Sequence, residues 1–226
     1  MGRRVGPIQL SLAGLVLVAC VVIPFLSWQG TWFGRPLDDE TLTQYLADQN
    51  KSRRVQHALA QIAERMERGD PEVAQWYQMV AQLSEHPGSE VRVTAAWVMG
   101  FDSTSELFHQ ALLQMVHDEE VLVRRNAALA LVRFGDDKGL NELRAMLASP
   151  VDAGQELLTL SPDPEHVWES LRALALVGGA AELQLVDSVS ENPHLSEEVR
   201  EQAALTRQAI QTRLAAIEET GTRSQK

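Results

Sequence analysis

The chain has 226 residues, of which 45% are hydrophobic, 5% are aromatic and only one is a cysteine. This length suits one medium-sized domain with an anchor, and a single cysteine excludes a disulfide framework and any site with four cysteine ligands. The net charge is −11, and residues 1–35 hold three basic residues and no acidic one, which leaves 17 basic against 31 acidic residues in the remainder. Such a remainder argues against a nucleic-acid-binding protein, which needs a basic face to neutralise phosphates.

The N-terminal segment is predicted to cross a membrane. Within an uncharged run of 30 residues, Ile8–Leu26 is a 19-residue stretch made mostly of Leu, Val, Ala and Ile. A helix of this length, rising about 1.5 Å per residue, nearly matches a hydrocarbon core of about 30 Å. We therefore expect a basic tail at 1–7, a transmembrane helix (a signal anchor) at 8–28 and a linker at 29–38.

The residues around this span predict its orientation. Trp28, Trp32 and Phe33 follow it, where amphipathic rings meet lipid headgroups. Two arginines precede the span and acidic residues at 38–40 follow it, and basic residues tend to remain on the cytoplasmic side. We therefore predict a single-pass protein of the inner (cytoplasmic) membrane, with its N-terminus in the cytoplasm and the remainder on the periplasmic side.

Three other interpretations of this segment compete with the signal anchor. Leu17-Val18-Ala19-Cys20 resembles a bacterial lipobox, which would make the protein a lipoprotein anchored through Cys20. The apolar run continues after the cysteine, however, where a lipoprotein normally becomes polar. A cleaved signal peptide and a buried core helix are the remaining alternatives.

Residues 39–217 are predicted to form helices that repeat. Four similar segments begin with a valine at positions 91, 123, 167 and 199, at spacings of 32, 44 and 32 residues. They read VRVTAAWVMGFD, VRRNAALALVRFGD, VWESLRALALVGG and VREQAALTRQAI. Helices with their own apolar faces are expected between them. One such pair cannot bury its apolar face alone, whereas a stack of pairs forms a continuous core.

The segment from Val123 shows the physical pattern most clearly. Val123, Ala127, Leu131 and Phe134 recur at spacings of four, four and three residues, which places them on one helical stripe. The small alanines of this segment allow a neighbouring helix to approach closely, and Gly135 is a natural helix stop. Asp118, just before the segment, is expected to cap the helix or to pair with Arg124.

This segment, with the aspartate before it, resembles a HEAT-type repeat, and most closely the bacterial HEAT-like repeats of the phycobilisome-lyase type. The segment from Val91 is a second good match, whereas Trp168 replaces the usual arginine in the third segment and the fourth lacks the terminal glycine. The resemblance implies an all-α fold: an α-solenoid of HEAT-like helical hairpins preceded by a single transmembrane helix. It covers roughly residues 85–215, and a more degenerate copy extends it over 40–84.

The surplus of the 44-residue spacing lies at 149–164, where three prolines and a glycine interrupt the helical pattern. We expect a long inter-repeat loop there, and long loops often bind ligands. The sequence of this loop also resembles one edge of a biotinyl/lipoyl-type β-hairpin, as found in periplasmic efflux adaptors, but it lacks the lysine that carries a swinging cofactor. The tail at 218–226 is polar and expected to be disordered.

The sequence shows no catalytic constellation. It contains no Gly-rich phosphate loop with a lysine, no G-x-S-x-G elbow and no pair of histidines at metal-ligand spacing. His117-Asp118-Glu119-Glu120 has a metal-compatible composition, but consecutive helical residues point in different directions, so a helix N-terminus is the simpler interpretation. We therefore predict no enzymatic activity, no metal, no cofactor and no small-molecule substrate.

Two sets of residues are candidates for binding a partner. Arg92, Arg124 and Arg200 occupy equivalent repeat positions, where they could bind an acidic partner or a carboxylate of a neighbouring repeat, and Arg125 extends this set. Trp97 and Trp168 are either core residues or exposed anchors of the kind enriched in binding hot spots.

Together these patterns predict a membrane-anchored HEAT-repeat scaffold or adaptor that binds a partner protein, as an accessory subunit of a membrane complex concerned with transport or electron transfer. A structural subunit of a large membrane assembly is one alternative. A chromophore lyase or isomerase, which the resemblance to lyase repeats suggests, is another.

Overall fold

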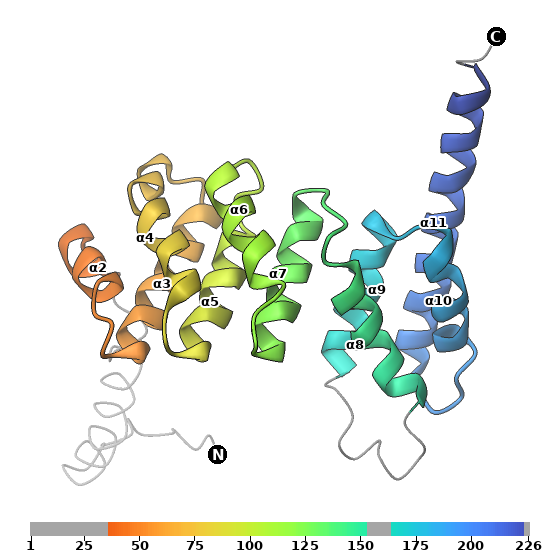
Figure 1. Ribbon diagram of the computed structural model, residues 1–226, viewed down its shortest axis with the longest axis horizontal. Helices are drawn as coiled ribbons and strands as arrows, with labels where there is room; N and C mark the ends of the chain where they lie inside the picture. Colours follow the sequence, from red (N-terminus) through yellow and green to blue (C-terminus); the bar gives the residue numbers. More distant parts are fainter. Residues whose placement is uncertain (1–35, 153–163, 224–226) are drawn as a thin grey trace, which may run out of the picture. The chain divides into compact units, whose positions relative to one another are not determined.

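The computed structural model describes residues 36–152 and 164–223. In these residues the chain forms ten α-helices, α2 to α11, with short 3₁₀ segments between some of them (Figure 1). The chain divides into two compact units, residues 1–42 and 43–226. The all-α fold class predicted from the sequence is confirmed for this part of the chain.

The predicted membrane span at 8–28, its interface residues Trp28, Trp32 and Phe33, and Cys20 lie outside the described residues. Within the described ranges, none of the helices combines the length and the apolar character that crossing a bilayer requires. In the first unit, Asp38 accepts a 2.8 Å hydrogen bond from the backbone N–H of Thr41 and so caps the start of α2.

The helices of the second unit pair in chain order. Their bounds are α2 (Asp39–Leu46, shared with the first unit), α3 (Ser52–Glu67), α4 (Tyr77–Gln82), α5 (Ser89–Met99), α6 (Glu106–Met115), α7 (Val121–Arg133), α8 (Leu140–Asp152), α9 (Pro164–Val177), α10 (Leu183–Ser190) and α11 (Glu197–Arg223). We call α4–α5, α6–α7, α8–α9 and α10–α11 pairs one to four. The second helices α5, α7, α9 and α11 pack on one another in sequence, and α3 packs on α5 (Figure 1).

The repeated valines form the spine of this core. Val91, Val123, Val167 and Val199 each lie on the second helix of a pair and are all buried. Ala127 and Ala128 of α7 are fully buried as well, which lets neighbouring backbones approach closely. A Cβ on Gly139, before α8, would lie only 2.7 Å from the Cα of Ala128. The predicted stack of slim helices is therefore present.

Glycine ends α7 as the sequence predicts. Gly135 has a φ of +71°, and the backbone N–H of Asp136 donates a hydrogen bond back to the carbonyl of Leu131. This left-handed turn satisfies carbonyls that the helix itself leaves without partners, and glycine adopts it without steric cost.

Two predicted boundaries need correction. Helix α8 continues to Asp152, so the loop expected at 149–164 begins later than residue 149. The segment 153–163, which includes most of the sequence that resembles a β-hairpin, lies outside the described residues. Helix α11 extends to Arg223, into the tail expected at 218–226, although Thr220, Gly221 and Thr222 in its last turns are weak helix formers.

A buried ion pair joins pair one to pair two. The Nε and one terminal nitrogen of Arg92 donate to the two carboxylate oxygens of Asp118, at 2.8 and 2.9 Å. A further nitrogen of Arg92 donates to the carbonyls of His86 and Pro87, just before its own helix. The Asp118 carboxylate thus pairs with an arginine of the preceding repeat, whereas Arg124 contacts Asp118 through the Asp118 backbone carbonyl.

A second series of polar contacts joins the two helices within a pair. The Tyr77 hydroxyl of α4 donates to Asp102, 2.7 Å away, just after α5. His109 of α6 is hydrogen-bonded to Asp136, 2.9 Å away, just after α7. In pair three, Arg144 of α8 donates to Glu182, just after α9. In each case the first helix holds an acidic residue that follows the second helix, although the donor changes from phenol to imidazole to guanidinium.

Removing the Asp118 carboxylate is expected to destabilise the stack strongly. Both side chains of the Arg92–Asp118 pair are about nine-tenths buried, and an arginine left without its carboxylate costs about 3–5 kcal/mol. Urea unfolding of Asp118→Asn should show this loss. The matched control is Glu64→Gln, which breaks an exposed pair with Arg68 and should cost no more than about 1 kcal/mol. Equal losses in the two variants would contradict a special role for the buried pair.

The same carboxylates predict loss of stability in acid. Burial acts to raise the pKa of Asp118, but hydrogen bonds from Arg92 and the Glu120 amide, together with the arginine charges, outweigh it, and the pKa lies below its usual value. The pKa values of Asp102, Asp136 and Glu182 are lowered against burial in the same way. Their contribution is therefore complete above the ordinary carboxyl pKa of about 4 and is lost as pH falls through the lower folded values.

Urea unfolding at pH 7, 5 and 3 measures this effect. The midpoint should fall between pH 5 and 3, and the stability difference between the wild type and Asp118→Asn should shrink over the same interval. A midpoint that stays constant down to pH 3 would contradict the expected linkage.

Candidate binding groove

Packing is loosest between pair two and pair three. Helices α4 and α6 pack together, as do α8 and α10, whereas α6 and α8 share few close contacts if any. Helix α7 also packs on α9 more sparsely than α5 packs on α7 or α9 on α11. The two helices α7 and α9 therefore leave a gap between them that side chains line.

A groove of about 420 Å³ lies in this gap. Its walls come from the end of α5, from α7 and α9, and from one residue of α11. The lining residues are Trp97, Gly100, Asn126, Leu129, Ala130, Val132, Arg133, Glu169, Arg172, Ala173, Ala175, Leu176 and Gln202. The volume lies in the range of about 300–1,000 Å³ that is usual for small-ligand sites, so the groove has room for a few side chains of a partner.

Equivalent positions of successive repeats line the groove. Trp97, Leu129 and Ala173 each stand six residues after the first valine of their segment. Gly100, Val132 and Leu176 each stand nine residues after it. The groove is thus a face that the repeat pattern itself presents, and side-chain size varies along it from glycine to tryptophan.

The wall on the side of α5 is aromatic and held in place. Trp97 is 43% exposed and packs edge-to-face on Phe101, with ring centroids 4.8 Å apart. The guanidinium of Arg133, from α7, lies over the same Phe101 ring and donates a 3.0 Å hydrogen bond to the carbonyl of Gly100. These contacts fix Trp97 with much of its ring in contact with solvent, which suits an anchor for an apolar side chain.

The wall on the side of α9 combines an apolar and a cationic residue. Leu176 is 65% exposed, which is more than any other large hydrophobic side chain in the described residues. One turn earlier on the helix, Arg172 holds its guanidinium 4.8 Å from the centre of the Trp168 ring. Trp168 is 36% exposed and stands at the edge of the groove without lining it.

The predicted partner-binding arginines lie elsewhere. Arg92 and Arg124 both bond carboxylates of a neighbouring pair: Arg92 bonds Asp118, and Arg124 bonds Glu142 at 3.1 Å. Arg125 lies 3.7 Å from the same Glu142. The sequence leaves two roles open for these arginines, binding a partner or binding a carboxylate of a neighbouring repeat. Their contacts match the second role, and none of the three lines the groove. The Nε of Arg200 is buried and has no hydrogen-bond partner among the described residues.

One of the predicted residues, Trp97, lies in the wall of the groove, and Trp168 does not line it but contacts Arg172, which does. The sequence reasoning missed the basic residues Arg133 and Arg172 and the exposed Leu176. A signal for Leu176 was available, since aligning the segments by their first valine places it level with Gly100 and Val132. No comparable signal existed for the two arginines, because their positions in the other repeats hold uncharged residues.

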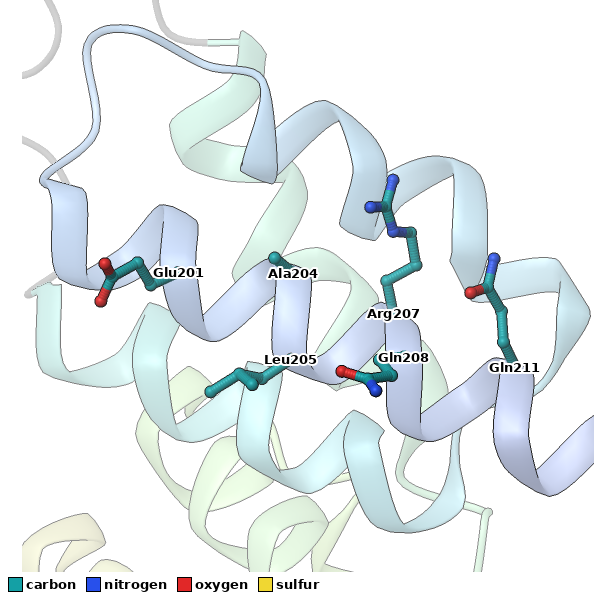
Figure 2. A pocket seen from close by; sticks show the side chains of 6 residues that line it. All are labelled: Glu201, Ala204, Leu205, Arg207, Gln208 and Gln211. Atoms are coloured by element: carbon teal, nitrogen blue, oxygen red, sulfur yellow. The ribbon is translucent and has the colours of Figure 1, made fainter.

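A second hollow, of about 500 Å³, lies along α11 and is lined by Glu201, Ala204, Leu205, Arg207, Gln208 and Gln211. All six residues belong to one helix, so the hollow has no opposite wall. Figure 2 shows Arg207 and Gln211 extending on one side of the helix and Leu205 on the other. We therefore take the groove between α7 and α9 as the candidate site.

The acidic cluster at His117–Glu120 forms a helix start, as the sequence predicts. The side chain of Glu120 caps α7, and Asp118 accepts a 2.9 Å hydrogen bond from the Glu120 backbone N–H. Among the described residues, histidine, cysteine and acidic side chains form no group of three or more that could hold a metal ion.

Comparison with known proteins identifies the repeats. Residues 77–156 match the family model of HEAT repeats. The match begins at Tyr77, the first residue of α4, and covers pairs one and two and the whole of α8. The HEAT-type repeats predicted from the segments at Val91 and Val123 are therefore confirmed. No curated protein sequence matches the chain at a significant level.

Proposed function

We propose that this chain is a membrane-anchored HEAT-repeat scaffold that binds a partner protein in the groove between α7 and α9. HEAT repeats generally mediate protein binding, because stacked helix pairs present an extended surface. The observation that carries the proposal is the groove itself, whose walls expose Trp97 and Leu176 to solvent. Large apolar side chains exposed together in a concave site are typical of an interface.

The proposal has a membrane part as well. An uncharged run at 8–28 flanked by Trp28, Trp32 and Phe33 supports a signal anchor that confines the groove near the periplasmic face of the inner membrane. The partner would then be a membrane complex, of which this chain is an accessory subunit in transport or electron transfer. The proposed role is binding, without catalysis and without a cofactor.

Truncating the two apolar walls is expected to abolish partner binding. In the double variant Trp97→Ala/Leu176→Ala, the groove loses the side chains that would fill contacts with the partner, and hot-spot truncations cost about 2 kcal/mol or more each, at least tenfold in affinity. Co-purification of the tagged full chain in mild detergent, followed by quantitative mass spectrometry, measures the loss.

The matched control for this experiment is Leu205→Ala, because Leu205 is also exposed but stands six residues after Val199 on α11, outside the groove. It should retain the full set of companions. Identical companions for the wild type and the double variant would contradict the assignment of the groove.

The anchor is tested separately. The full chain should remain in the membrane fraction after alkaline carbonate extraction, and a variant without residues 1–35 should be released from it. The variant Cys20→Ser distinguishes the two modes of anchoring: a transmembrane anchor keeps its membrane association and its mass apart from the substitution, whereas a lipoprotein loses both the lipid mass and the anchor. Release of the wild type by carbonate would contradict the anchor.

A further inference from the structure

The two arginines of the groove differ from most arginines of the stack in having no acidic partner. Arg92, Arg124 and Arg144 each bond a carboxylate of a neighbouring element. Arg133 and Arg172 form no ion pair within the described residues. In a chain of net charge −11, carboxylates are the abundant partner, so two unpaired guanidiniums at one site stand out.

Their geometry leaves hydrogen-bond donors available. One terminal nitrogen of Arg133 is used by the Gly100 carbonyl, which holds the side chain across the groove. The Arg172 guanidinium lies over the Trp168 ring and forms no hydrogen bond within the described residues, so its N–H groups remain for another acceptor. A guanidinium fork of this kind matches a carboxylate with two parallel hydrogen bonds.

The charge of the groove favours an anionic occupant. Its lining includes two arginines and a single acidic residue, Glu169, so it is positive where the remainder of the chain is strongly negative. Next to these charges stand Trp97 and Leu176, which need an apolar side chain to cover them. An occupant that satisfies both features carries a carboxylate close to a bulky apolar group.

We propose that the groove binds a peptide segment of the partner in which an Asp or Glu side chain stands within about two residues of a bulky apolar side chain. The apolar side chain packs between Trp97 and Leu176, and the carboxylate accepts hydrogen bonds from Arg172 and Arg133. This inference rests on the proposed function, because it names the chemistry of the segment that the scaffold binds.

A displayed library of random dodecapeptides tests the inference on the full chain held in nanodiscs. The library is selected on the wild type and counter-selected on Trp97→Ala/Leu176→Ala, so that only ligands of the groove are enriched. The expected result is a consensus with an acidic residue beside Leu, Ile, Met, Phe or Trp. The best peptide is then synthesised with an amidated C-terminus, which removes any contribution from a terminal carboxylate.

Fluorescence anisotropy with this peptide measures the part played by the charges. Arg172→Gln should weaken binding about tenfold or more, which is typical of a lost hydrogen bond to a charged group. Replacing the peptide's acidic residue with its amide should cost a similar factor, and the two changes together should cost little more than either alone. The matched control is Arg53→Gln, because Arg53 is exposed on α3 outside the groove and should bind like the wild type.

The outcomes separate the two levels of the proposal. Enriched peptides without an acidic residue, or equal affinity for the wild type and Arg172→Gln, would overturn the acidic partner and leave the groove as a binding site. Loss of binding on amidation of the C-terminus would overturn it too, in favour of a terminal carboxylate. If no peptide distinguishes the wild type from the double variant, the groove itself is refuted and the inference falls with it.

Discussion

The second unit depends on one constraint: no helix pair in it can cover its own apolar face. Val91, Val123, Val167 and Val199 are buried only because each second helix packs on the next, and the alanines around them let the backbones approach. Stability in such an array is a sum of neighbour contacts. Every interface between pairs therefore contributes to stability, and the polar contacts between pairs add to the apolar core.

Acidic residues at the turns form such polar contacts both between neighbouring pairs and within a pair. Asp118 holds Arg92 of the preceding pair, whereas Asp102, Asp136 and Glu182 each hold the first helix of their own pair. Since these carboxylates are engaged within the fold, the excess negative charge of the chain is partly structural. The groove differs from this arrangement, since its two arginines, Arg133 and Arg172, form no ion pair within the described residues.

The periodic part of the fold could be predicted from the sequence, because a valine stripe, paired alanines and a terminal glycine report directly on helix faces and ends. The boundaries at Asp152 and Arg223 could not, because Pro150 and Gly221 are helix-ending signals in the sequence and both helices continue past them. Trp97 and Trp168 could be singled out by residue type, but not separated from core residues. Arg133 and Arg172 were missed because only the fold shows which arginines lack a carboxylate.

The position of the groove follows from the same argument about regularity. Where the segments repeat at 32 residues, between Val91 and Val123 and between Val167 and Val199, the second helices pack closely. The 44-residue spacing falls between α7 and α9, and there the packing is loosest and the groove opens. Regular spacing thus builds the stack, and the one irregular step provides the surface at which a partner can be held without disturbing the buried valines.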